Sequence, residues 1–85
     1  MNIVFTEEAK KDLKKMNPTI AKMIIDALRD IGNLENPRSR GKALVGNKKG
    51  FWRYRIQNYK VLCRIKDNVM IIEVVKIGHR RNVYS

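Results

Sequence analysis

The sequence contains little cysteine, few acids and no long apolar run. Cys63 is the only cysteine, which excludes an internal disulfide and a zinc cluster built on cysteines. The best apolar run, residues 69–75, already includes Glu73 and is too short to cross a bilayer. Acids and lysines follow Phe5 at once, so the N-terminus does not resemble a secretory signal. We therefore expect a cytoplasmic protein that does not enter a membrane.

The scarcity of acids leaves a large positive charge. The 85 residues carry 19 Lys and Arg against 8 Asp and Glu, a formal net charge of +11. After Arg38 the only acids are Asp67 and Glu73. This distribution is typical of proteins that bind a polyanion, with nucleic acid as the first candidate and an acidic protein as the second. With 44% hydrophobic residues, we expect one small domain, residues 1–85, with a modest core.

The first half predicts a strand and two helices. Asn2–Phe5 has the composition of a short strand, and apolar residues at helical spacing predict a first helix over residues 7–16. Asn17 precedes a proline and begins a second helix over residues 18–32. The short break between the helices predicts an antiparallel helical hairpin.

The second half predicts a loop and three strands. Residues 36–50 are rich in Gly, Pro, Asn and cations and form the loop, which Lys42-Ala43-Leu44 anchors to the core. We expect strands at about residues 51–56, 59–65 and 69–77, joined by turns at Gln57-Asn58 and Asp67-Asn68, with a tail from Gly78. The predicted fold is α+β in the order β-α-α-β-β-β. Its helical hairpin packs on one face of an antiparallel-dominated sheet and leaves the other face open.

The alternation in FWRYRIQNYKVLCRI, residues 51–65, assigns side chains to the two faces. Successive side chains of a strand point to opposite faces, so the aromatic and aliphatic residues share one face and the cations share the other. The helix-side residues are Trp52, Tyr54, Val61, Cys63, Ile65, Met70, Ile72 and Val74, and the open-face residues are Arg53, Arg55, Lys60, Arg64 and Glu73. The predicted register sets Arg55 opposite Lys60. Like charges directly opposite each other are destabilising, which indicates that an anion binds there.

Several blocks of the chain together resemble the RelE/ParE superfamily, the toxins of type II toxin–antitoxin pairs. The matching blocks are Lys42-Ala43-Leu44 with Gly46, Trp52-Arg53-Tyr54-Arg55-Ile56, Tyr59-Lys60-Val61-Leu62, Ile77-Gly78-His79-Arg80-Arg81 and Val83-Tyr84. The resemblance spans essentially the whole chain and is strongest to the RelE branch, so it implies the RelE-like microbial RNase fold. RelE-like toxins are ribosome-dependent endoribonucleases that cut mRNA through attack of a ribose 2′-OH on the adjacent phosphate, without a metal.

The resemblance also implies partners and alternatives. The expected partners are an acidic RelB-like antitoxin, the ribosome and mRNA, and operator DNA that the toxin–antitoxin complex binds through the antitoxin. No cofactor and no metal are expected. ParE-like members share the fold but act on DNA gyrase, and a non-catalytic basic RNA-binding module is a third reading of the same open face.

Metal-free cleavage needs a base that removes the proton of the 2′-OH, stabilisation of the phosphorane charge, and a proton for the 5′-oxygen that leaves. Arginine binds phosphate through two parallel N–H groups but is a poor base. The resemblance therefore implies that Arg53, Arg55 and Arg80 form a clamp that binds the phosphate. Lys60 can add to this clamp. Further RNA contacts are predicted at Lys48, Lys49, Arg64 and Arg81.

The base itself stays open between His79, Lys60 and Tyr84. His79 is the only histidine, and imidazole ordinarily titrates near neutrality. We expect His79 to lie among the arginines of the open face and the tail. Tyr84 is also a candidate for stacking on a base. Glu73 is interpreted as a structural partner of an arginine, and Cys63 as a core residue.

Overall fold

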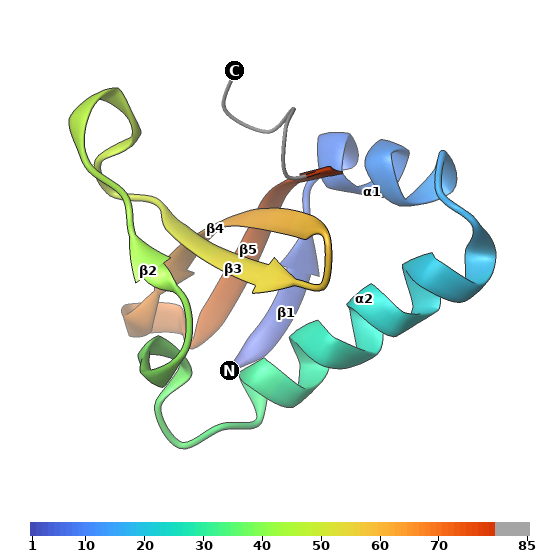
Figure 1. The fold of residues 1–85 in the computed structure, drawn as a ribbon. Coiled ribbons are helices and arrows are strands. Elements are labelled where there is room, and N and C mark those ends of the chain that lie inside the picture. The colour runs from blue at the N-terminus through green and yellow to red at the C-terminus, as the bar shows by residue number, and fades with distance from the viewer. Residues whose placement is uncertain (80–85) are drawn as a thin grey trace.

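The computed structural model describes residues 1–79 and contains one five-stranded sheet with both α-helices on one side (Figure 1). The strands are β1 (Asn2–Phe5), β2 (Lys42–Ala43), β3 (Trp52–Ile56), β4 (Tyr59–Lys66) and β5 (Ile71–His79). The helices are α1 (Glu7–Lys14) and α2 (Pro18–Gly32), and short 3₁₀ turns are η1 (Pro37–Ser39), η2 (Gly46–Lys48) and η3 (Asp67–Val69). The strand order is β1-β5-β4-β3-β2; β1 pairs with β5 in parallel, and the other pairs are antiparallel. The predicted α+β class is therefore confirmed, with β2 as an added two-residue strand.

The two helices begin where their caps predict. Thr6 Oγ1 accepts a hydrogen bond of 3.1 Å from Ala9 N, and Asn17 Oδ1 accepts one of 2.8 Å from Thr19 N. Each bond satisfies an N–H group that the first turn of a helix leaves without a partner. α1 ends at Lys14, two residues before the predicted end, whereas α2 has the predicted bounds. No helix within residues 1–79 is long and apolar enough to span a membrane.

The core lies between the helical hairpin and the sheet. The helices supply Ala9, Ile24, Leu28 and Ile31, and the sheet supplies Tyr54, Ile56, Val61, Cys63, Ile72, Val74 and Ile77. These buried sheet residues include most of those predicted from alternation. Met70 is an exception, because it is 58% exposed and takes the left-handed conformation (φ 56°) that ends η3. The turn therefore includes all of η3, and β5 begins two residues later than predicted.

The register of β3 and β4 is the one that the sequence predicts. Trp52 pairs with Cys63, Tyr54 with Val61, and Arg55 with Lys60 across the tight turn at Gln57-Asn58. β5 continues through Gly78 to His79 instead of ending at Ile77, and an irregularity in its pairing with β4 lies at Leu62/Cys63.

Helix α1 protects the part of β5 that β1 does not reach. β1 ends at Phe5, opposite Val74, so the edge of β5 is open from the next residue on. There Thr6 Oγ1 donates to Val75 O at 2.9 Å, and Asp12 Oδ2 accepts from Ile77 N at 2.9 Å. Unpaired backbone groups at a sheet edge otherwise stay unsatisfied or pair with another chain. Thr6 and Asp12 supply the hydrogen bonds that a neighbouring strand would make there.

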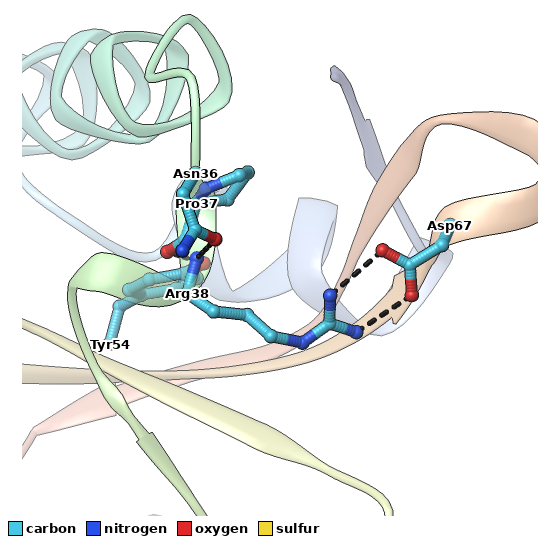
Figure 2. A network of polar contacts seen from close by, with 5 residues as sticks. All are labelled: Asn36, Pro37, Arg38, Tyr54 and Asp67. Carbon is cyan, nitrogen blue, oxygen red and sulfur yellow. Dashed lines mark hydrogen bonds and ion pairs between the residues drawn. The ribbon is translucent and has the colours of Figure 1, made fainter.

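Side chains of β3 fix residues 36–50 to the sheet, and Figure 2 draws one of them, Tyr54, with Asn36, Pro37 and Arg38 of this segment. The buried Tyr54 hydroxyl donates to Pro37 O at 2.9 Å, and Trp52 Nε1 donates to Arg40 O at 2.9 Å. Arg38 binds both carboxylate oxygens of Asp67 at 2.8 Å, so this loop is also joined to the β4–β5 turn. Of the predicted anchor Lys42-Ala43-Leu44, Lys42 and Ala43 form an exposed two-residue strand, and Leu44 is half-buried but does not join the core. The hydrogen bonds of Tyr54 and Trp52 hold the loop to the sheet instead.

Candidate nucleic-acid interface

The open face of the sheet carries its cations in rows that run across the strands. One row consists of Arg55 in β3, Lys60 in β4 and Gly78 in β5, which are successive pairing partners. The next row contains Lys42, Arg53, Leu62 and Lys76 in the same way. Directly paired residues point to the same face. The structure therefore brings Arg53, Arg55 and Lys60 together, as the alternation predicts.

The two ends of this face differ in their charge balance. At one end, Glu73 lies 3.7 Å from Arg64 and 3.6 Å from Lys66, measured between charged atoms. Glu73 is thus placed as the predicted structural partner of an arginine. At the other end, within residues 1–79, no carboxylate forms an ion pair with Arg53 or Arg55. An incoming anion therefore meets the least competition at Arg53 and Arg55.

The buried surroundings of Arg53 strengthen its electrostatic attraction for an anion. Its neighbour in the row, Leu62, is only 4% exposed although it lies outside the core under the helices. Arg53 Nε is itself buried and has no hydrogen-bond partner within the described part of the chain. The attraction between opposite charges becomes stronger as water is excluded. A phosphate is therefore attracted more strongly by Arg53 than by a fully hydrated arginine on the surface.

Phe51 and Arg64 form a third row next to this cluster. The guanidinium carbon of Arg64 lies 4.6 Å from the centre of the Phe51 ring. Arg64 pairs with Glu73, which pairs with the exposed Val4 of β1. No role for Phe51 is predicted from the sequence, although extending the predicted register by one residue sets it opposite Arg64.

His79 lies on the other face from the arginines. It pairs with Tyr59, and the two rings make an edge-on contact with centroids 6.0 Å apart. Ile77, two residues earlier in the strand, is buried in the core. Alternation therefore directs His79 to the helix side, and the expectation that it lies among Arg53 and Arg55 is wrong.

The remaining predicted site residues are divided between the loop and the chain end. Lys48 ends η2 and Lys49 follows it, in a loop that protrudes from the sheet between β2 and β3 (Figure 1). The structure does not bring these lysines into the rows of the open face. Arg80, Arg81 and Tyr84 lie outside the described residues, so their predicted roles stay predictions.

Two buried titratable side chains are unsuited to proton transfer at neutral pH. Burial raises the pKa of the Cys63 thiol to about 12. Burial, with a smaller contribution from Cys63, raises the pKa of Tyr54 to about 12. Both belong to the helix-side core, which confirms the structural role predicted for Cys63. Within residues 1–79, no group of three His, Cys, Asp or Glu side chains is placed to hold a metal.

A groove of about 560 Å³ lies between the two helices. Its apolar lining comes from both helices and the break between them, and consists of Leu13, Met16, Pro18, Ala21 and Ile25. The charged residues that border it are Lys14, Lys22, Asp26 and Arg29. This surface is separate from the open face of the sheet.

Comparison with known proteins gives consistent matches over nearly the whole chain. The family model described as the ParE toxin of the type II toxin-antitoxin system parDE matches residues 3–84. Toxin RelG of Mycobacterium tuberculosis is 30% identical over 81 residues, which cover 94% of this chain and 91% of that protein. A chain in the crystal structure of the M. tuberculosis toxin–antitoxin complex RelBE2 is 28% identical, with a TM-score of 0.83 over 95% of this chain and 92% of that one. A chain of the intact E. coli RelBE complex is 14% identical, with a TM-score of 0.70 over 92% and 94%, which shows a shared fold.

Proposed function

This chain belongs to the RelE/ParE superfamily of type II toxin–antitoxin toxins, and from that premise we propose that it is a ribosome-dependent endoribonuclease that cleaves mRNA. The observation that carries the proposal is the pairing of Arg55 with Lys60, next to Arg53, with no acid paired to either arginine within residues 1–79. A sheet that keeps like charges opposite each other is stabilised when an anion binds between them. A phosphodiester is such an anion.

The arginines supply electrostatic stabilisation of the reaction. Arg53 and Arg55 project from one strand on the same face, so both can donate to the same phosphate or to neighbouring phosphates. A guanidinium stays charged and offers parallel N–H groups, which suits the extra negative charge of the phosphorane formed by 2′-OH attack. Arg80 and Tyr84 complete the proposed catalytic set from the chain end.

We assign the general base to Lys60 in preference to His79. Lys60 stands directly opposite Arg55 on the open face, whereas His79 is directed to the helix side against Tyr59. A base must come within hydrogen-bonding reach of the proton that it removes. An ammonium can lose its proton, which a guanidinium does not do in proteins. Tyr84 is the other candidate.

The proposed partner is an acidic RelB-like antitoxin. The M. tuberculosis and E. coli structures that resemble this chain are toxin–antitoxin complexes. The net charge of +11 favours an acidic partner, and the apolar groove between α1 and α2 fits one face of an amphipathic helix. Co-expression with the product of an adjacent gene tests this, and toxicity that no neighbouring gene relieves would contradict it.

Primer extension on mRNA from cells that express the protein tests the nuclease. We expect cuts inside codons with the wild-type chain and a strong loss of cutting with Arg53→Ala and Arg55→Ala. Removing one donor of this kind typically lowers the rate by about 10²–10³-fold. Lys11→Ala, which removes an exposed lysine from α1, is the matched control and should cut normally. Normal cutting by both arginine variants would overturn the assignment of the open face.

DNA gyrase is the second candidate target, because the family model that matches residues 3–84 is that of ParE toxins. The same cells separate the two activities. A gyrase poison leaves mRNA intact and changes the supercoiling of a reporter plasmid, whereas a ribosome-dependent nuclease cuts mRNA and leaves plasmid topology unchanged. A protein that binds RNA but does neither would be the non-catalytic binding module.

A further inference from the structure

We propose that Phe51 and Arg64 form a stacking platform for one unpaired base of the RNA, beside the phosphate site at Arg53. The inference rests on the proposed function and adds the subsite that holds a base. It assigns a role to Phe51, which lies just before β3, and a more specific role to Arg64 than contact with phosphate.

Two neighbouring side chains restrain the guanidinium of Arg64. The Phe51 ring lies against the guanidinium of Arg64, with 4.6 Å between the guanidinium carbon and the ring centre. Glu73 approaches the same guanidinium from the neighbouring strand, with 3.7 Å between Arg64 Nη1 and Glu73 Oε1. The Arg64 side chain is still 53% exposed. Two neighbours therefore restrain the planar group and leave part of its surface open to a ligand.

The charge balance favours a base over a phosphate at this position. Glu73 offsets part of the charge of Arg64 and Lys66, whereas within residues 1–79 no carboxylate pairs with Arg53 or Arg55. A phosphate is drawn most strongly to Arg53 and Arg55, where no carboxylate within residues 1–79 reduces the positive charge. A neutral base gains mainly from stacking, and unpaired bases stack on aromatic rings and on guanidinium planes.

The spacing along the strand suits one nucleotide. Phe51 and Arg53 are two residues apart on the same face, which corresponds to about 6.6 Å along a strand. The phosphate and the base of a single nucleotide are separated by a distance of this order. An RNA strand that runs along β3 can therefore place a phosphate at Arg53 and its base on Arg64.

The test compares two short RNA probes that carry the same charge. Binding of the full chain to a hexamer of adenosine and to an abasic ribose-phosphate hexamer is measured by fluorescence anisotropy. Base stacking is worth a factor of roughly five or more in affinity. We expect the wild-type chain to prefer the adenosine hexamer by at least this factor. Phe51→Leu and Arg64→Lys should each weaken binding of the adenosine hexamer more than binding of the abasic hexamer, and so reduce the preference.

The controls separate this proposal from the nuclease. Arg64→Lys keeps the positive charge but removes the planar guanidinium. Phe51→Leu keeps an apolar side chain but removes the aromatic ring. Lys11→Ala, on the surface of α1, should behave as wild type. A wild-type chain without preference for the adenosine hexamer, or variants that keep it, would overturn the platform even if mRNA is cut. Loss of the preference in both variants, in a protein that cuts no mRNA, would support the platform and refute the nuclease. In the wild type, NMR signals of the Phe51 ring should shift with the adenosine hexamer only, which checks the result without a substitution.

Discussion

Replacing Asp12 by alanine gives opposite expectations from the local sequence and from the tertiary structure. Asp12 lies in the last turn of α1, where a negative side chain faces the negative end of the helix dipole. Relief of that repulsion is worth about 0.3–1 kcal/mol, and alanine is the better helix former by up to about 0.7 kcal/mol. Judged from the helix alone, Asp12→Ala stabilises the protein.

The hydrogen bond of Asp12 to β5 outweighs this gain. Asp12 Oδ2 accepts from Ile77 N at 2.9 Å in a partly buried position, at the edge that β1 does not cover. A hydrogen bond to a charged group is worth about 1.5–3 kcal/mol, and its loss also leaves the Ile77 N–H without a protein partner. We therefore expect Asp12→Ala to lower the free energy of unfolding by about 1 kcal/mol net, which corresponds to roughly 4–8 °C in Tm for a domain of this size.

Thermal and urea unfolding, followed by circular dichroism, measure the effect. Asp12→Asn keeps an acceptor oxygen in place and should recover most of the loss. Asp26→Ala is the matched control, because Asp26 is an exposed carboxylate whose 3.0 Å ion pair with Lys22 lies within one helix. It should change stability by no more than about 0.5 kcal/mol. An Asp12→Ala protein as stable as the wild type, or more stable, would show that α1 does not hold the edge of β5.

Three further predictions concern the core and the loop. Because burial raises the pKa of the Cys63 thiol to about 12, Ellman's reagent should react with Cys63 only after denaturation, and rapid reaction in native buffer would contradict its burial. The hydrogen bonds from Arg38 lower the pKa of Asp67 in the folded state, so their stabilisation is complete above the unfolded pKa of about 3.9 and is lost as the pH falls through the folded pKa. Asp67→Asn should accordingly lose less stability than the wild type between about pH 5 and pH 2 in urea titrations. Gly41→Ala should lower the urea midpoint clearly, because Gly41 has φ +79° and a Cβ there would lie 2.5 Å from both Arg53 O and Trp52 Nε1; an unchanged midpoint would contradict the packing of this loop.

The features predicted correctly from the sequence depend on local chemistry. Asn17 followed by a proline fixes the start of α2, and the alternation on both sides of Gln57-Asn58 fixes the register of β3 and β4. In both cases the information lies within a few residues of the element. The placement of Arg53 and Arg55 follows from the same alternation.

The features that were missed depend on contacts between distant segments. The bond from Asp12 to Ile77 joins residues 65 apart, and nothing in the pattern of α1 indicates an acceptor for a strand edge. Met70 was expected in the core because it continues the alternation of Ile72 and Val74 backwards. The η3 turn takes Met70 out of the sheet before that alternation begins.

The position of His79 is the most instructive difference, because a single irregularity in β5 decides it. Between Leu62 and Cys63 the partners on β5 change from Lys76 to Val74, so Val75 is an extra residue in that strand. Such a bulge reverses the face of every later side chain. Counting by twos from Glu73 places His79 on the open face, and the bulge moves it to the helix side.

The signal for this bulge is present in the sequence. Ile72 and Val74 are apolar at even positions, yet the next even position is Lys76 and the apolar residue beside it is Ile77, at an odd one. Strict alternation would instead direct Lys76 into the core and Ile77 onto the cationic face. An unpaired buried ammonium is far more costly than one unpaired strand residue, so the bulge is the stable solution. It also sets Gly78, and not Ile77, opposite Lys60, which keeps the space beside that ammonium clear of a side chain from β5.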